Sequence, residues 1–166
     1  MTSKLTLREL VTLSLLGALL FVVQVVFGFL PNIELVSLLV ILYTRVYGWK
    51  VLYPIYLFVA LEGMFYGITT WFIHYLYIWT ILAIVTMIFR RVEMPAAWVL
   101  INTAFGFSFG ALCAIAYLFM GGPSVAIAYW IHGILYDLLH AVGNCITAIV
   151  LYKPLHHLLL RLQKST

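Results

Sequence analysis

Charged residues are scarce in this chain of 166 residues: they make up 8% of it, with nine basic and five acidic side chains. Soluble domains carry about 25% charged residues. Here 66% of the residues are hydrophobic and the mean hydropathy is +1.14. This composition excludes an ordinary soluble domain and predicts an integral membrane protein.

Cysteine and the usual catalytic motifs are also lacking. Cys113 and Cys145 lie in apolar runs, far from any CxxC spacing, and are expected to be small buried residues that form neither a disulfide nor a metal site. The sequence contains no HExxH, GxSxG or Walker A pattern and no cluster with zinc-ligand spacing. These absences favour a protein that is not an enzyme and has no metal or other cofactor.

Long apolar runs occupy most of the chain. Because a membrane span needs roughly 20 apolar residues, the sequence predicts an all-α integral membrane protein with six transmembrane helices, short loops and a single domain over residues 1–166. The first run lacks a small-residue cleavage site and is expected to remain as a helix, not to be removed as a signal peptide. Pro154 is expected to begin an amphipathic tail. The predicted spans are residues 10–26, 33–47, 51–66, 71–89, 95–119 and 125–152.

The basic residues are distributed on one side of this predicted topology. All nine Lys and Arg fall in the N-terminal lead, the loops after the second and fourth spans, and the C-terminal tail. The other three turns contain none. By the positive-inside rule, both termini are expected to be cytoplasmic. The net charge of +4 is thereby attributed to membrane topology, and no nucleic-acid partner is expected.

Polar residues form a stripe on the predicted sixth span. At about 100° per residue, one narrow face carries a series of residues spaced three or four apart. An unpaired charge in hydrocarbon costs several kcal/mol, so this face is expected to meet other helices or a wet cavity. The stripe consists of Trp130, Gly133, Asp137, His140, Asn144 and Ala148.

Further acids, a histidine and several aromatic rings are expected at the same depth, in the outer half of the membrane. Ionisable groups inside spans are functional candidates by default, and aromatic rings with a few polar groups are the usual lining of a small-molecule site. The candidate ligand-binding residues are Asn32, Glu34, Glu62, Tyr66, Trp71, His74, Tyr75, Trp79, Trp130, Asp137, His140 and Asn144.

Structural roles remain open for the polar residues of the sixth span. Asp137 and His140 could pair with each other inside the membrane and hold helices together. Asn144 could serve as a hydrogen-bond donor across helices. The rings of Trp71, Tyr75 and Trp130 could equally belong to an aromatic belt at the membrane interface.

Structural alternatives also exist for the other acids. Glu62 could pair with His74 across the hairpin of the third and fourth spans. Glu34 could stabilise the start of the second span, because an acid in the first turn of a helix interacts favourably with the helix dipole. Asn32 could be the N-cap of that helix.

Small residues mark one face of the first span. Ser14 and Ala18 are separated by four positions, with Gly17 beside them, and this spacing permits close approach of another helix. The three residues are candidates for a partner interface, although small residues also pack helices within one chain.

These features together resemble the substrate-binding S component of an energy-coupling factor (ECF) vitamin transporter. The resemblance covers nearly the whole chain: six short spans, a first span with small residues, the sequence 30–36 (Leu-Pro-Asn-Ile-Glu-Leu-Val) opening the second span, and Asp137-x-x-His140-x-x-x-Asn144 running into 151–155 (Leu-Tyr-Lys-Pro-Leu). The family's Ala-x-x-x-Ala docking motif corresponds to Ser14 and Ala18, where serine is a mild departure.

The resemblance implies a multi-pass protein of a prokaryotic plasma membrane that captures a vitamin or vitamin precursor from outside. It also implies partners: a transmembrane coupling subunit and two ATPase subunits, which would hydrolyse the ATP. A pyridoxine-like or hydroxymethylpyrimidine-like heterocycle is the expected ligand, because the predicted site is aromatic and contains no Lys or Arg. The alternative is a self-contained, proton-coupled transporter or channel that acts as a homo-oligomer.

Overall fold

The computed structural model describes residues 5–30 and 33–164, and every regular element in these ranges is a helix. The elements are α1 (Leu7–Phe27), α2 (Val36–Tyr47), the short 3-10 helix η1 (Gly48–Val51), α3 (Leu52–Tyr66), α4 (Thr70–Ile88) and α5 (Pro95–Lys164). The all-helical prediction is therefore confirmed. A capping box lies at the start of α1: the Thr6 hydroxyl accepts the Glu9 N–H, and the Glu9 carboxylate accepts the Thr6 N–H.

Three of these helices are long and apolar enough to cross a membrane, which supports a membrane-embedded protein. They are α1, α4 and α5. Helix α2 has 12 residues and α3 has 15, so at 1.5 Å per residue they extend about 18 and 22 Å and fall short of the roughly 30 Å hydrocarbon core. The second and third predicted spans are thus present as helices but are shorter than a full span.

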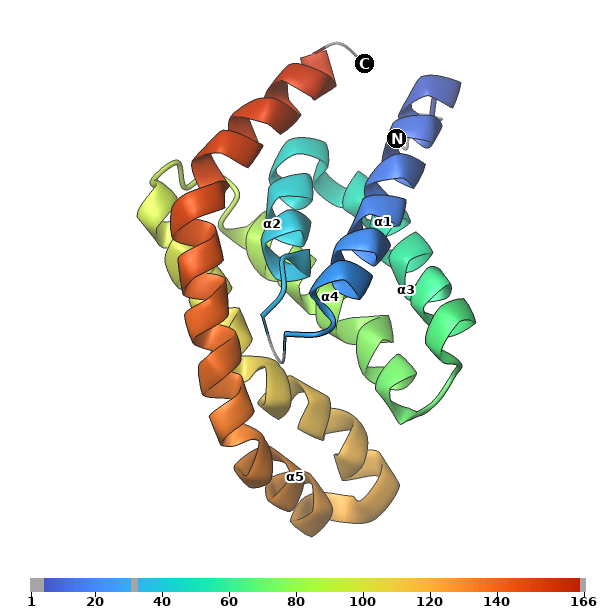
Figure 1. Cartoon of the computed structure of the whole chain (residues 1–166), viewed down its shortest axis with the longest axis vertical. Helices are drawn as coiled ribbons and strands as arrows, with labels where there is room; N and C mark the ends of the chain where they lie inside the picture. Colours follow the sequence, from blue (N-terminus) through green and yellow to red (C-terminus); the bar gives the residue numbers. More distant parts are fainter. Residues whose placement is uncertain (1–4, 31–32, 165–166) are drawn as a thin grey trace.

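Helix α5 contains both of the last two predicted spans. Gly122 divides it, with φ of 82° and ψ of 179°, and Pro123 follows. Residues 95–121 and 123–164 form two limbs of a helical hairpin, called here the first and second limbs of α5 (Figure 1). The second limb continues through Pro154 to Lys164, so the expected tail is a continuation of the helix. Proline removes one backbone hydrogen bond there without ending the helix.

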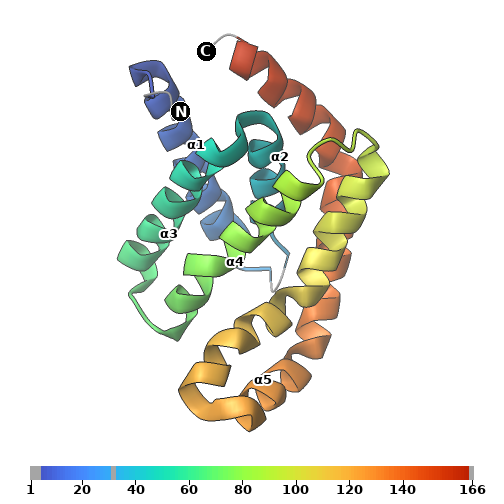
Figure 2. The same ribbon diagram turned by 180° about the vertical axis from the view of Figure 1, so that it is seen from behind.

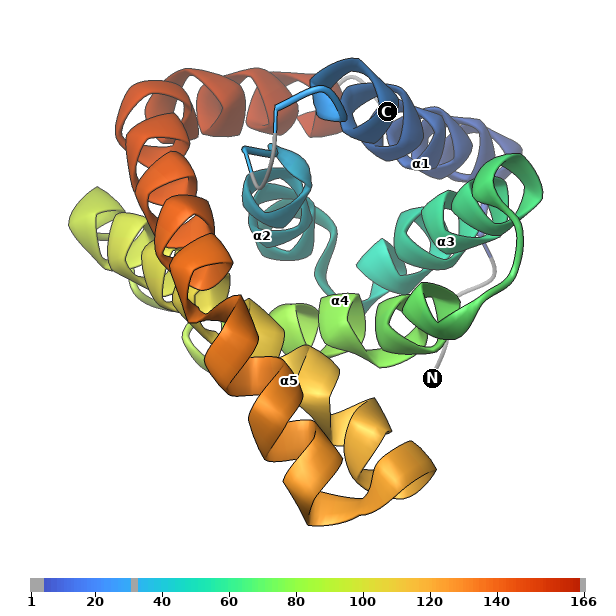
Figure 3. The same cartoon turned by 60° about the horizontal axis from the view of Figure 1, so that its bottom comes forward.

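Helix α2 lies at the centre of the molecule. Figure 3 shows it surrounded by α1, α3, α4 and the second limb of α5. Ten of its 12 residues are buried, and a helix that is apolar on all sides is stable only when other elements cover it completely. The residues just before α2 are therefore held close to several other helices at once.

The basic segments gather at one end of the molecule. Both termini and the turn from α2 to η1 lie toward that end in Figure 1, whereas the break at Gly122 lies at the opposite end. Lys50 of η1 forms an ion pair with Glu9 of α1 there. Arg45 bonds to the hydroxyl of Tyr152 and lies 4.7 Å from the centre of the Trp98 ring, which joins α2 to both limbs of α5.

Two asparagines join the limbs of α5. Asn102 Nδ2 donates to the backbone carbonyl of Asn144 at 2.9 Å, and Asn144 Nδ2 donates to the carbonyl of Asn102 at 3.2 Å. Both side chains are fully buried. Hydrogen bonds of this kind contribute about 0.6 kcal/mol each on average in membrane proteins.

We expect Asn102→Ala to lower the free energy of unfolding by about 1 kcal/mol, because it removes one bond and leaves a small cavity. Thermal unfolding in detergent measures this loss. The same measurement on Asn144→Ala and on the double variant completes a double-mutant cycle. The double variant should lose less than the sum of the two single losses. Strict additivity would show that the two amides act independently.

Candidate functional site

A cavity of about 170 Å³ lies at the start of α2, where the end of α1, α4 and both limbs of α5 meet. Four of its lining residues were predicted as site residues. They are Glu34 just before α2, Tyr75 and Trp79 on α4, and His140 on the second limb of α5. The complete lining is Gln24, Phe27, Gly28, Leu30, Ile33, Glu34, Tyr75, Trp79, Phe109 and His140. We refer to this as the Glu34–His140 pocket.

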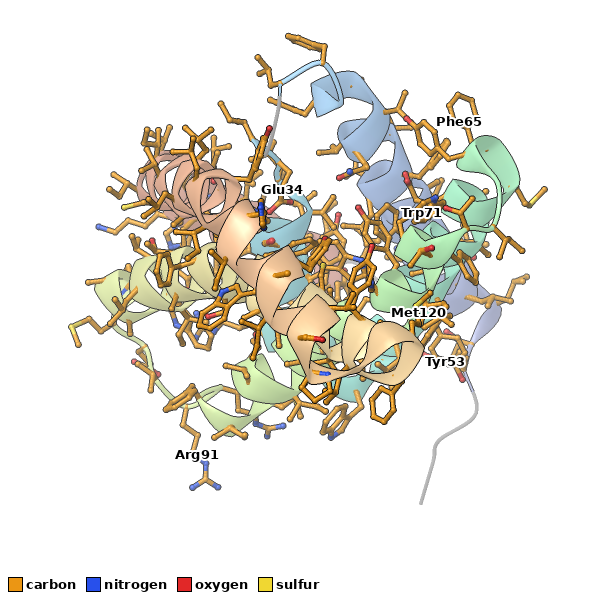
Figure 4. The ribbon with its side chains drawn as sticks, turned by 90° about the horizontal axis from the view of Figure 1, so that it is seen from below. Glu34, Tyr53, Phe65, Trp71, Arg91 and Met120 are labelled. Carbon is orange, nitrogen blue, oxygen red and sulfur yellow. The ribbon has the colours of Figure 1, made fainter. Side chains whose placement is uncertain are left out.

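Glu34 is held in the Glu34–His140 pocket by two hydrogen bonds from Ser37. Its Oε2 accepts the backbone N–H of Ser37 at 2.8 Å, and its Oε1 accepts the Ser37 hydroxyl. The carboxylate thus satisfies an N–H group that the helix leaves unpaired, as the structural alternative for Glu34 supposed, although Glu34 lies before α2 and not in its first turn. Figure 4 shows Glu34 beside the second limb of α5, in the interior, whereas Arg91 points away from the molecule.

Glu34 also pairs with His140 across the interior. The distance from His140 Nε2 to Glu34 Oε1 is 3.1 Å, and both side chains are nearly buried. The ring of His140 meets the ring of Phe109 edge-on, with centroids 4.9 Å apart. The alternative stated for His140 was a pair with Asp137 on the same face, but the carboxylate bonded to its ring is Glu34, just before the central helix.

Aromatic rings form the opposite side of the pocket. Tyr75 and Trp79, one turn apart on α4, meet edge-on at 5.4 Å, and Trp79 lies 6.0 Å from Phe109. The indole Nε1 of Trp79 is buried and has no hydrogen-bond partner among the described residues. Because buried donors are normally satisfied, this unpaired N–H is an exception in a residue that lines the pocket.

Six lining residues were not among the predicted candidates: Gln24, Phe27, Gly28, Leu30, Ile33 and Phe109. Gln24 Nε2 donates to the Tyr75 hydroxyl at 3.4 Å. It is the one amide side chain in the apolar run of the first span, so its isolation was a signal. Phe109 carried no such signal, because it is one of eleven phenylalanines in the chain.

Three other predicted site residues are buried but lie outside this pocket. Glu62 and His74 do not pair with each other: Glu62 Oε1 and His74 Nε2 both lack a hydrogen-bond partner among the described residues. Asp137 Oδ1 accepts the backbone N–H of Gly110 at 2.8 Å, while its Oδ2 also lacks a partner. No three His, Cys, Asp or Glu side chains in the described part of the chain come together as a metal site.

The remaining candidates are separated from the pocket. Tyr66 is half exposed and Trp130 is 43% exposed, while Trp71 reaches Tyr75 at 5.3 Å without lining the cavity. Asn144 joins the limbs of α5, which is the structural alternative stated for it. Asn32 lies outside the described residues.

The small residues of α1 have different surroundings. Gly17 is buried against α3, where an added Cβ would lie 3.0 Å from the carbonyl oxygen of Pro54. Gly17 therefore packs two helices of the same chain, which is the alternative stated above for the small residues. Ser14 is exposed and Ala18 is half-buried, so the partner interface stays a prediction for these two residues.

Comparison with known proteins gives no indication of function, so the function proposed below rests on the geometry of the site. No family model matched the chain, and no match was found among curated proteins or among solved structures.

Proposed function

We propose that this chain is a membrane-embedded capture protein that binds a small heterocyclic vitamin or vitamin precursor in the Glu34–His140 pocket. The observation that carries the proposal is the joint placement of a buried carboxylate–imidazole pair and four aromatic rings around one cavity of about 170 Å³. Such a combination of apolar walls with a few fixed polar groups is typical of small-molecule sites.

The size and chemistry of the pocket favour one flat ring. Sites for drug-sized ligands measure about 300–1,000 Å³, so a cavity of about 170 Å³ suits a smaller molecule. The rings of Tyr75, Trp79 and Phe109 offer stacking surfaces. Glu34 can accept hydrogen bonds from ring nitrogens or hydroxymethyl groups, and no Lys or Arg lines the pocket. A pyridoxine-like or hydroxymethylpyrimidine-like compound satisfies these requirements.

The proposal includes the topology of six membrane segments with both termini cytoplasmic. The gathering of the basic segments at one end of the molecule supports it, because the positive-inside rule assigns such an end to the cytoplasm. Helices α2 and α3 would then cross only part of the bilayer. The Glu34–His140 pocket lies near the ends of α1 and α2 that face away from the basic end, so the ligand would enter from outside.

Partners are the second part of the proposal. As in ECF transporters, the chain would bind its ligand alone and would need a transmembrane coupling subunit and two ATPase subunits for uptake. The exposed Ser14 on α1 is a candidate contact for that coupling subunit.

Transport measurements in proteoliposomes test whether this chain only binds the ligand and depends on partner subunits for uptake. With the purified chain alone, we expect tritiated pyridoxine or hydroxymethylpyrimidine to bind but not to accumulate inside the vesicles. Accumulation by the chain alone that responds to a pH gradient would contradict the capture role and favour the self-contained proton-coupled transporter. Failure of both compounds to bind would overturn the ligand assignment.

A further inference from the structure

A second cavity, of about 620 Å³, lies between the two limbs of α5. Its lining residues lie between positions 109 and 137, in the hairpin of α5 whose turn projects beyond the other helices in Figure 2. Phe109 lines both this cavity and the Glu34–His140 pocket, so one ring forms part of the wall of each. The other cavity-lining residues come from both limbs and include Tyr117, Tyr129 and Asp137.

Asp137 gives this cavity a buried negative group. The residue is 5% exposed, and its Oδ1 accepts the backbone N–H of Gly110 at 2.8 Å. A Cβ at position 110 would lie 2.5 Å from Asp137 Oδ2, so glycine is what lets the carboxylate come so close to the first limb. Oδ2 itself has no donor among the described residues.

Among the described residues, His140 is the basic group whose charge acts on that carboxylate, and its Nε2 is already bonded to Glu34. The residues that line the cavity include no Lys or Arg. The ring of His132 is bonded through Nδ1 to the carbonyl of Ala128, at 2.7 Å on its own helix. Leaving a buried charge unpaired costs several kcal/mol, so buried carboxylates are normally paired with a cation. Within the described part of the chain, Asp137 therefore has no cation in contact with its Oδ2, and His140 is shared with Glu34.

Aromatic rings line this cavity or lie beside it. Tyr117 and Tyr129, from opposite limbs, stack with centroids 4.2 Å apart. The ring of His74 from α4 lies 5.5 Å from Tyr117 and 6.4 Å from Tyr129. Ring faces attract ammonium ions within about 6 Å, and quaternary ammonium groups are characteristically bound by such rings together with a carboxylate.

We infer that this cavity is a second binding site, for a small organic ammonium ion, with its positive nitrogen held by Asp137 beside the tyrosine rings that line the cavity. The volume of about 620 Å³ lies within the usual range for small-molecule sites. The inference does not rest on the function proposed for the Glu34–His140 pocket. Two sources share this chemistry: a water-soluble amine, and the ammonium head group of a membrane lipid.

Calorimetric titration tests the site with defined probes. The full chain is purified in a neutral detergent with phosphatidylglycerol as the only lipid, and tetramethylammonium and methylammonium are titrated separately. We expect saturable binding of one ion per chain, weakened at least about tenfold in Asp137→Asn because a charge-assisted contact is lost. Glu93→Gln, which removes an exposed acid outside the cavity, should bind as the original chain does.

Native mass spectrometry with phosphatidylethanolamine in place of the soluble ions distinguishes the two sources. Retention of this lipid that depends on Asp137 assigns the site to a lipid head group, whereas binding of the soluble ions assigns it to a free amine. Tyr129→Leu, which keeps the carboxylate, is the second variant should Asp137→Asn fail to fold, and it should also weaken binding.

Absence of binding by every ammonium probe would overturn the inference, as would equal binding in the original chain and both cavity variants. Either result would leave ligand binding in the Glu34–His140 pocket unaffected, because Glu34 and His140 do not line this cavity. The two proposals therefore fail separately.

Discussion

Glu34→Gln is expected to weaken binding of the captured heterocycle by about tenfold to a hundredfold. The substitution keeps an oxygen that can accept the Ser37 N–H, so the start of α2 is preserved. It removes the negative charge that faces the pocket and pairs with His140. Hydrogen bonds to charged groups contribute about 1.5–3 kcal/mol, which corresponds to this loss of affinity.

The measurement is equilibrium binding of tritiated pyridoxine and hydroxymethylpyrimidine to purified variants. Glu93→Gln is the matched control, since it removes a carboxylate of the same type from the exposed loop before α5. Thermal unfolding of both variants separates loss of binding from loss of fold. Unchanged affinity in a folded Glu34→Gln protein would contradict the placement of the ligand beside this carboxylate.

Gly106→Val is expected to lower the free energy of unfolding by about 2–3 kcal/mol and to abolish ligand binding as well. A Cβ at this position would lie 3.0 Å from the backbone N of Ala141, from Asn144 Nδ2 and from the carbonyl carbon of His140. Two of these three atoms are backbone and cannot move aside, and overpacking of a well-filled interior costs about 1–3 kcal/mol. Separation of the limbs would also displace His140 from Glu34.

Gly133→Val is the control for that experiment. Both glycines are helical and on α5, so the change in helix propensity is the same, but a Cβ at Gly133 meets nothing within 4 Å. Its thermal unfolding should change by less than about 1 kcal/mol. Equal destabilisation by the two substitutions would show that close approach of the limbs at Gly106 is not what requires glycine.

The helical architecture could be predicted because long apolar runs have few alternatives to helices in a membrane. The break at Gly122 was predictable for the same local reason, since Gly121, Gly122 and Pro123 interrupt an apolar run. Spacing predicted the burial of only part of the sixth-span stripe: Asp137, His140, Asn144 and Ala148 are buried, whereas Trp130 is 43% exposed and Gly133 is half-buried.

The partners of those side chains could not be predicted in the same way. Helical periodicity says which residues share a face, but it does not say which other helix lies opposite. His140 meets Glu34, 106 positions earlier, because the short α2 is enclosed by the other helices. Asp137 is held by a backbone N–H of the first limb, and Gly110 gave no sign in the sequence of so close an approach.

The most direct test of the central claim is native mass spectrometry of the chain purified in mild detergent, followed by release and identification of any bound small molecule. The account predicts one heterocycle per chain that is lost or strongly reduced in Glu34→Gln and retained in Glu93→Gln. Retention of the same molecule at full occupancy in Glu34→Gln would contradict the Glu34–His140 pocket as the capture site.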